Sequence, residues 1–349
     1  MLDEVHQEIE LFAGDKNMYT LGEIGGHNIV MACLPEGIMG ITPASVVAVN
    51  MLRSFPKIRF GLLVGIGGGA PARRPQPSKG IPDIRLGDVV VSIPEGTSGK
   101  MNFWPLSASL LTDAVGGVVK YDRGKVIAGG EFQPTGMLNM PPTVLTAAVA
   151  KLRSLHESKR NAITRNVTSM ISRVLESEDA NPDFEELYKC PNLKYDRLFE
   201  ADYEHIESRE ESEASDYDDD SDEIPLPCRT CDPARLVVRK ARKSQDPVVH
   251  YGLIASADQV MRHGITRERI RKKYGVFCFE MEAAGLMNDF PCLVIRGICD
   301  YSDTHKHKIW QRYAAATAAA YAKELLGVVS KEDITSVEDA AAVLKRGEC

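Results

Sequence analysis

Residues 276–303, VFCFEMEAAGLMNDFPCLVIRGICDYSD, carry the strongest indication of the fold. Residues 276–279 are apolar and read as an extended segment, and small, helix-favouring residues follow them. We therefore expect Glu282 at a strand-to-helix junction, where the helix N-terminus favours its charge. The nearly continuous apolar run 292–299 is typical of a strand buried in a parallel sheet, and it ends at Asp300. Ligands of open α/β sheets collect outside the carboxyl ends of the strands, so we expect the two carboxylates to share one pocket. Taken singly, each carboxylate could equally be a helix cap.

The composition is that of a soluble globular protein. Of the 349 residues, 44% are hydrophobic and 26% charged, which predicts one large α/β domain with a substantial core. The formal net charge of −7 comes mainly from residues 207–223, and this balance argues against nucleic acid as a partner. The N-terminus lacks the features of a signal peptide, and the most apolar helical stretch, 313–326, is interrupted by Lys323 and Glu324. We therefore expect a cytoplasmic protein without a membrane span.

Strand-like and helical segments alternate along the chain, which predicts an α/β fold with a central, largely parallel sheet. The expected strands are residues 19–24, 27–33, 58–66, 88–93, 126–129, 249–255 and 292–299. The expected helices are residues 42–54, 142–154 and 259–274.

The strand rhythm disappears between residues 157 and 247, which we interpret as one long irregular insertion in a domain spanning residues 1–329. Its acidic run, 207–223, is expected to be disordered because it repels itself and has little to bury; an acidic clamp for a basic partner is the alternative. The tail, 330–349, should contain a short helix beginning near Ser336, where a capping-box pattern starts.

The eight cysteines do not predict a disulfide framework, because several lie in apolar runs and should be buried thiols. No cofactor is expected, apart from a structural zinc ion that Cys228 and Cys231 could bind. Their CxxC spacing suits a metal, and Cys190 and His205 lie upstream in the same region. Plain loop cysteines are the alternative.

The glycine-rich segment 64–71, VGIGGGAP, follows a buried strand and would let the backbone approach a ligand closely. It is not a dinucleotide-binding motif, because residues 71–80 contain three prolines and no convincing helix follows. Without further context, a tight turn is the expected structure. Residues 83–92, DIRLGDVVVS, then turn and enter the next strand.

The ordered motifs VGIGGGAP, DIRLGDVVVS, HYGLIASADQVM, FEMEAAGLM and VIRGICDYSD resemble those of the nucleoside phosphorylase and nucleosidase superfamily. The resemblance covers about residues 19–326 apart from the insertion. The stretches KVIAGGEFQPTGMLNMPP and IWQRYAAATAAAYAKELL are similar to the phosphorylase-like domains of fungal NACHT or NB-ARC receptor-type proteins. The resemblance implies a three-layer α/β/α fold with a mixed, largely parallel sheet, and a homo-oligomer.

The resemblance also implies roles for individual residues. Asp300 would hydrogen-bond and protonate N7 of a departing purine, and Glu282 would hold the ribose hydroxyls and favour an oxocarbenium-like transition state. Further substrate-binding residues would be Gly67 and Gly68 near the nucleophile, Val260, Met261 and Phe279 around the base, Met281 against the sugar, and Glu280. For the three residues around the base, ordinary core packing is the alternative.

Water is favoured over phosphate as the nucleophile. Several members of the superfamily place a phosphate-binding arginine where this chain has Leu62 and Leu63. Arg73, Arg74 and Lys79 follow the glycines and could bind the phosphates of a nucleotide such as ATP, or could simply be solvated.

The chain departs from the superfamily at its N-terminus. Members open with an extra strand whose turn supplies a third carboxylate, whereas residues 1–6 resemble the helix that follows it. We therefore expect the first strand to be missing, with Glu4 in that helix. Three hypotheses remain: a hydrolase that releases adenine from adenosine or its phosphates, a phosphate-dependent phosphorylase, and a catalytically weak nucleoside-binding module.

Overall fold

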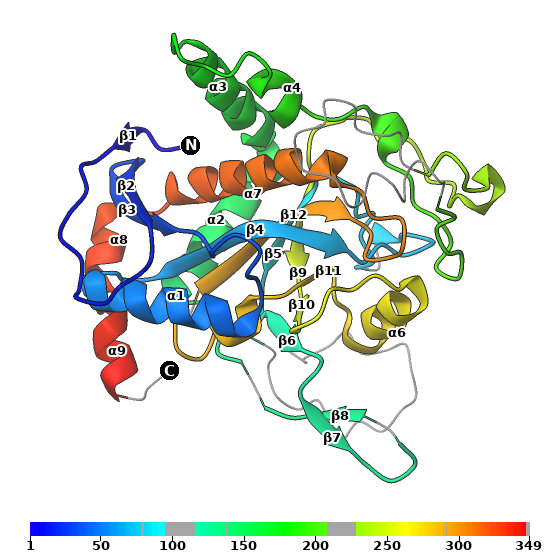
Figure 1. Cartoon of the computed structure of the whole chain (residues 1–349), viewed down its shortest axis with the longest axis horizontal. Coiled ribbons are helices and arrows are strands. Elements are labelled where there is room, and N and C mark those ends of the chain that lie inside the picture. The colour runs from blue at the N-terminus through cyan, green and yellow to red at the C-terminus, as the bar shows by residue number, and fades with distance from the viewer. Residues whose placement is uncertain are drawn as a thin grey trace.

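A seven-stranded sheet forms the centre of the molecule (Figure 1). The computed structural model describes residues 1–77, 80–94, 116–130, 132–136, 138–207, 228–290 and 292–346. The strand order is β6-β10-β11-β4-β12-β5-β9. The strands are β4 (Gly61–Gly69), β5 (Val89–Ser92), β6 (Val118–Lys120), β9 (Val249–Gly252), β10 (Ile254–Ser256), β11 (Cys278–Glu280) and β12 (Cys292–Asp300).

The sheet is mixed. β6, β10 and β11 are parallel to one another, as are the strands of the pairs β4–β12 and β5–β9. Only β4–β11 and β5–β12 are antiparallel among the described ladders of this sheet. The prediction of a mixed, largely parallel sheet is therefore confirmed.

Helices lie on both faces of the sheet (Figure 1). One face carries α7 (Gln311–Leu326), with α2 (Thr143–Ser158) and α3 (Ile163–Leu175) beside it, and α1 (Ile41–Ser54) lies on the other. α6 (Gly264–Tyr274) packs beside β10 and β11 through Ile270. This arrangement gives the three-layer α/β/α architecture.

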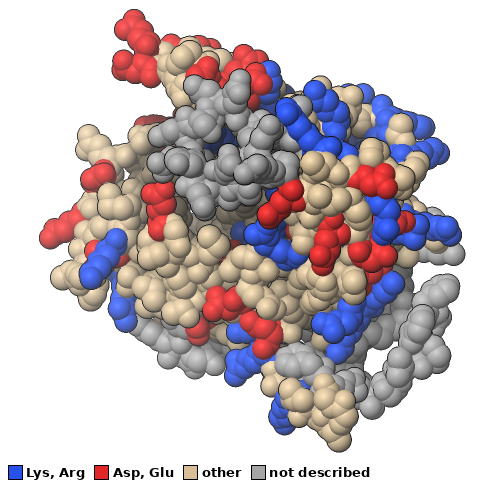
Figure 2. Space-filling view, turned by 45° about the vertical axis from the view of Figure 1, so that its right-hand side comes forward, with Lys and Arg blue, Asp and Glu red and all other residues tan. Residues whose placement is uncertain are grey.

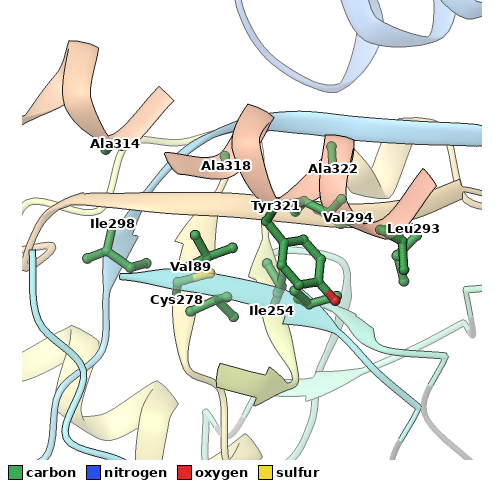
Figure 3. Close-up of a cluster of buried hydrophobic side chains, with 14 of the residues drawn as sticks. Val89, Ile254, Cys278, Leu293, Val294, Ile298, Ala314, Ala318, Tyr321 and Ala322 are labelled. Carbon is green, nitrogen blue, oxygen red and sulfur yellow. The ribbon is translucent and has the colours of Figure 1, made fainter. Parts of the chain in front are cut away.

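α7 packs unusually close to β12. Its small residues Ala314, Ala318 and Ala322 repeat every four positions and so form one ridge over the strand (Figure 3). At Gly297 the approach is so close that an added Cβ would lie 1.8 Å from the Ala314 carbonyl oxygen. Alanine on the helix and glycine on the strand together allow this contact.

The N-terminal residues form a separate antiparallel sheet, and the prediction of a helix over residues 1–6 is wrong. β1 (Glu4–Val5) pairs with β2 (Tyr19–Ile24), which pairs with β3 (His27–Ala32). The backbone amides of Asp3 and His6 donate to carbonyls of β2 at 2.7 and 2.8 Å, which fixes the extended conformation.

The insertion is more regular than expected. α3 lies inside the segment predicted to be irregular, and its Ile163, Val167 and Ile171 are buried at four-residue spacing against the layer that contains α7. The same segment contains the short helices α4 (Phe184–Tyr188), η2 (Leu193–Tyr195) and η3 (Pro233–Arg235). Apart from Glu207, the acidic run lies outside the described residues.

Three further boundaries differ from the sequence predictions. α6 begins only at Gly264, since residues 259–263 form a loop. Gly264 packs so close to the insertion that an added Cβ would lie 2.4 Å from the Ala201 carbonyl oxygen. The expected strand 249–255 is interrupted at Leu253, and its halves, β9 and β10, occupy separate places in the sheet. The expected strand 126–129 is instead β7 (Gly124–Val126), which pairs with β8 (Phe132–Pro134).

The tail contains two short helices, α8 (Lys331–Ser336) and α9 (Ala340–Arg346). The capping box is formed by Ser330 and Asp333 at the start of α8, and not at Ser336. η5 (Lys308–Trp310) leads directly into α7.

Acidic and basic side chains are interspersed over the face shown in Figure 2. Within the described part of the chain, no helix has the length and apolarity that crossing a membrane requires.

Candidate functional site

The glycine-rich segment is a strand, so the prediction of a tight turn is wrong. Gly65, Gly67 and Gly68 belong to β4 and lie between β11 and β12. An added Cβ at Gly65 would lie 2.4 Å from Nη1 of Arg296, and one at Gly68 would lie 2.7 Å from Oδ1 of Asp300. The absence of side chains on β4 therefore creates room for polar groups that extend from β12.

Asp300 is the last residue of β12 and pairs in register with Gly68. Its carboxylate is buried and held from several sides. Oδ1 accepts a hydrogen bond from the Ser302 amide at 2.7 Å, while Oδ2 lies 3.1 Å from Nζ of Lys306 and 3.3 Å from Sγ of Cys299. Ser302 has a φ of 55°, a left-handed conformation that turns the chain sharply after the strand. Asp300 is thus fixed in orientation at a strand end.

Glu280 and Glu282 are both held by Arg296. Nη2 of Arg296 lies 2.5 Å from Oε2 of Glu280 and 3.0 Å from Oε2 of Glu282. Arg296 and Glu280 are each 5% exposed, and a buried charge of this kind requires a partner. Arg296 belongs to β12, whereas Glu280 ends β11 and Glu282 follows it. The guanidinium therefore crosses β4, the glycine strand that lies between β11 and β12.

The two glutamates differ in their backbone contacts. Oε2 of Glu280 accepts hydrogen bonds from the amides of Glu282 and Ala283, at 3.0 and 2.9 Å, and so caps the turn η4 (Ala283–Gly285). The expected helix after Glu282 is only this single turn. Glu282 does not cap it, since its side chain reaches only Arg296 and, at 3.4 Å, the Met281 amide.

Burial raises the pKa of Glu282 above its usual range, and the neighbouring Glu280 acts in the same direction, while the Arg296 guanidinium opposes both. Such a carboxylate has unused hydrogen-bonding capacity in a partly buried position. It is the kind of group that can bind hydroxyls of a ligand.

Glu282 and Asp300 do not arrive at a common carboxyl edge of parallel strands, as the sequence suggested. β11 runs antiparallel to β4, whereas β12 runs parallel to it. Glu282 contacts Arg296, whose position is level with Gly65, and Asp300 is level with Gly68. The backbone segments that carry the two carboxylates therefore flank β4, with Glu282 after β11 and Asp300 at the end of β12.

The residues expected around a base fall into two groups. Phe279 and Met261 are buried together with Tyr121, whose ring meets that of Phe279 edge-on at 5.6 Å. Val260 is 49% exposed in the loop before α6, and Met281 is half-buried. Phe279 pairs with Gly68, so the apolar cluster lies directly beside the glycine strand.

The residues suggested for phosphate binding do not converge on this site. Arg73 is exposed and pairs with Glu200 at 2.6 Å, Arg74 is also exposed, and Lys79 lies outside the described residues. Leu62 and Leu63 are half-buried in β4. A surface hollow of about 500 Å³ lies elsewhere, beside α2, α3 and α7, and contains none of the predicted site residues.

The structure brings part of the suggested metal site together. Ligand atoms of His205, Cys228 and Cys231 all lie within 4.8 Å of one another, whereas Cys190 is not part of this group. Both clustered cysteines are buried, and Cys190 is exposed.

Sequence reasoning missed Arg296 and Lys306. Arg296 could have been found, because a charged residue inside the apolar run 292–299 must be buried and therefore paired. Nothing local marks Lys306, because its contact with Asp300 depends on the sharp turn at Ser302.

Comparisons with known proteins add two kinds of relative, although no family model matches the chain. The curated nucleotide-binding leucine-rich repeat (NLR)-like protein of Hyaloscypha variabilis is 42% identical over 333 residues, which cover 95% of this chain. The match covers 28% of that protein, so the chain spans less than a third of its length.

Solved structures that are similar to the chain include a futalosine hydrolase and two nucleosidases. Futalosine hydrolase of Helicobacter pylori has a TM-score of 0.48 and 13% identity, with 93% of this chain and 89% of that chain covered. The 5'-methylthioadenosine/S-adenosylhomocysteine nucleosidase of the same organism has a TM-score of 0.49, with the same identity and coverage. The corresponding nucleosidase of Neisseria meningitidis has a TM-score of 0.47 and 15% identity, with coverages of 94% and 91%. The resemblance to fungal receptor-type proteins, identified from the sequence, agrees with the NLR-like relative.

Proposed function

We propose that this chain is a purine N-ribosyl hydrolase that releases adenine from adenosine or ATP-type substrates. The observation that carries the proposal is the pair of carboxylates on either side of the glycine strand. Asp300 is held by Lys306, and Glu282 is held by Arg296. Two carboxylates carried by the strands on either side of β4 suit a ligand with two recognition points, such as the base and the sugar of a nucleoside.

Buried polar atoms support a polar ligand or ordered water at this place. Nε of Arg296, Oε1 of Glu280 and Oγ of Ser302 are buried without a hydrogen-bond partner among the described residues. Such groups are rare in folded proteins unless something else satisfies them. All three belong to residues that adjoin β4 or the turn after Asp300.

In the proposed reaction, Asp300 donates a proton to N7 of the purine while the bond between the base and C1' of the ribose breaks. The electron pair of that bond goes to the base, and water adds to C1' and loses a proton. Protonation makes the base a better leaving group. Glu282 accepts hydrogen bonds from the ribose hydroxyls, which strengthen as positive charge develops on the sugar.

Hydrolysis is favoured over phosphorolysis. A phosphate dianion needs a cationic cradle, usually of arginines. Arg73 is instead paired with Glu200 on the surface, and Leu62 and Leu63 offer no charge.

A nucleoside-binding module with weak catalysis is the second candidate, and Lys306 favours it. Its ammonium group lies 3.1 Å from Oδ2 of Asp300, so it neutralises the carboxylate and competes with a base for that oxygen. A module of this kind would bind the ligand without releasing adenine.

The test is chromatographic identification of products after incubation with adenosine or ATP, with and without phosphate. Adenine with free ribose or ribose triphosphate, formed at the same rate without phosphate, is the expected result. Ribose 1-phosphate formed only with phosphate would instead establish the phosphorylase. Ligand binding without adenine would establish the binding module.

A further inference from the structure

The strongest unassigned feature outside the candidate site is a cluster of one imidazole and two thiols. Nδ1 of His205 lies 3.2 Å from Sγ of Cys231, and Sγ of Cys228 completes the group within 4.8 Å. The cysteines are 4% and 3% exposed. His205 precedes them by more than twenty positions, so the fold, and not the local sequence alone, assembles the cluster.

The backbone orients both thiols toward one point. Cys228 has a φ of 58°, and the Cys231 amide donates to its carbonyl at 3.4 Å, which closes a turn over the CxxC segment. A left-handed conformation is uncommon for residues other than glycine and usually has a local cause. Here it places Cys228 and Cys231 on the same side of the turn.

We propose that Cys228, Cys231 and His205 bind a zinc ion. Thiolate and imidazole ligands suit zinc, and its bond lengths of about 2.3 Å to sulfur and 2.0 Å to nitrogen separate tetrahedral ligand atoms by about 3.5 Å. The observed separations bracket that value. The surrounding Phe199, Tyr203 and Leu236 form a small apolar cluster that shields the cysteines.

His305 packs beside the cluster, but its ring nitrogens are not among the ligand atoms that lie within 4.8 Å of one another. Its buried ring stacks on Phe199 at 4.1 Å and lies 5.5 Å from the His205 ring. Neither ring nitrogen makes a hydrogen bond to a described residue, and Nδ1 lies 3.5 Å from Oδ1 of Asp303. The proposal therefore rests on three protein ligands, Cys228, Cys231 and His205.

The zinc ion would lie beside the loop that follows Asp300. His205 already contacts this loop, because its amide donates to Oγ1 of Thr304 at 2.8 Å. His305 belongs to the same loop, and the next residue, Lys306, pairs with Asp300. The metal is therefore structural and stabilises the loop that orients the candidate acid.

The test is the zinc content of the full chain, purified under reducing conditions and measured by mass spectrometry after removal of free metal. One zinc ion per chain is expected for the wild type and for Cys190→Ser, which removes an exposed cysteine of the same segment outside the cluster. Cys228→Ser and Cys231→Ser should lose most of it. Wild-type protein without zinc, or serine variants that retain it fully, would overturn the proposal.

Cobalt substitution keeps the test decisive if the serine variants fold poorly. Wild-type protein loaded with cobalt should show thiolate-to-cobalt charge-transfer absorption, which a thiol-blocking mercurial should abolish with release of the metal. A cobalt spectrum without thiolate bands would contradict the proposal. None of these readouts depends on nucleosidase activity.

Discussion

Arg296 contacts both glutamates at the end of β11, but the two carboxylates differ in their other contacts. Glu280 stabilises the backbone turn, because its Oε2 accepts hydrogen bonds from two amides of the turn as well as from the guanidinium. Glu282 contacts the same guanidinium but caps nothing. Similar residues two positions apart should therefore respond differently to the same substitution.

Glu282→Gln should weaken turnover more than folding. A neutral amide loses the charge-assisted hydrogen bonds to ribose hydroxyls, worth about 1.5–3 kcal/mol, so kcat/KM should fall by about 10- to 150-fold. Glu280→Gln should instead lower the unfolding free energy, because it weakens a buried ion pair. Kinetics and denaturant titrations of both variants test this division. Equal effects on stability would contradict it.

Arg296→Met should destabilise the fold by about 3–5 kcal/mol, because it leaves Glu280 charged and buried without its partner. Chemical denaturation measures the loss. The double variant Arg296→Met with Glu280→Leu should recover part of it, since the buried charge of Glu280 is removed together with its partner. If the double variant were less stable than the single one, the ion pair would not be the cause.

Some of this site could be predicted from sequence, and the rest depends on long-range contacts. Asp300 was placed correctly because the apolar run before it has only one plausible end. The partner of Arg296 could not be known, since the direction of β11 is set by pairing with β4 and not by its own residues. The proximity of His205 to the CxxC pair could not be predicted either, because it too depends on long-range contacts.

At the scale of elements, β4 is the feature that local patterns describe least well. Glycines have no side chains to alternate between faces, so the sequence suggested a turn where the backbone continues as a strand. By contrast, α1 and α7 were predictable, because apolar and small residues recur at helical spacing.

Gly68→Ala should disturb both packing and chemistry. The added Cβ would lie 2.2 Å from Oγ of Ser302 and 2.7 Å from Oδ1 of Asp300, so we expect a loss of about 1–3 kcal/mol and of most adenine release. Gly327→Ala is the matched control, because its nearest contact would be an ordinary 3.4 Å. Thermal unfolding and product assays compare them. An active, stable Gly68→Ala variant would refute the crowding argument.

Asp88, just before β5, makes side-chain contacts with β9 and with the end of the insertion. Its buried carboxylate accepts hydrogen bonds from Arg242 at 2.6 and 2.7 Å and contacts Nε2 of His250 at 2.8 Å. Burial alone would raise its pKa, but the hydrogen bonds from Arg242 and His250 hold the pKa at about 2. The depressed pKa predicts a pH-dependent contribution to stability.

This contribution is fully present above the ordinary pKa of 3.8 and is lost as the pH falls through about 2. It should amount to about 2 kcal/mol of unfolding free energy. Asp88→Asn should be less stable at neutral pH, and its stability should fall less between pH 5 and pH 2. Denaturant titrations at several pH values check the slope; parallel pH curves for both proteins would contradict it.

At the scale of the whole molecule, we propose a homo-oligomer, as the resemblance to the superfamily implies. Exposed apolar side chains of Ile38, Met39 and Val46 lie on and before α1, and Val260 is exposed in the loop before α6. The two segments meet, because the Ile41 amide lies 3.4 Å from Oδ1 of Asp258. We therefore assign the interface with a second copy to the apolar surface formed by these two segments.

Met39→Asp combined with Val46→Asp should shift the chain toward a monomer in light scattering coupled to size-exclusion chromatography. The control is Val238→Asp, which changes a 95% exposed apolar residue in the insertion and should leave assembly unaltered. A wild-type chain that is monomeric at high concentration would remove the basis for this interface.

The measurement that tests the central claim most directly is adenine release by the wild type, Asp300→Asn and Asp289→Asn, together with nucleoside binding by each. Asp289 is the control because it is an exposed aspartate between β11 and β12. Asp300→Asn should lose about 10²- to 10⁴-fold in rate and still bind nucleoside, while Asp289→Asn should match the wild type. Full turnover by Asp300→Asn would contradict the assignment of Asp300 as the acid.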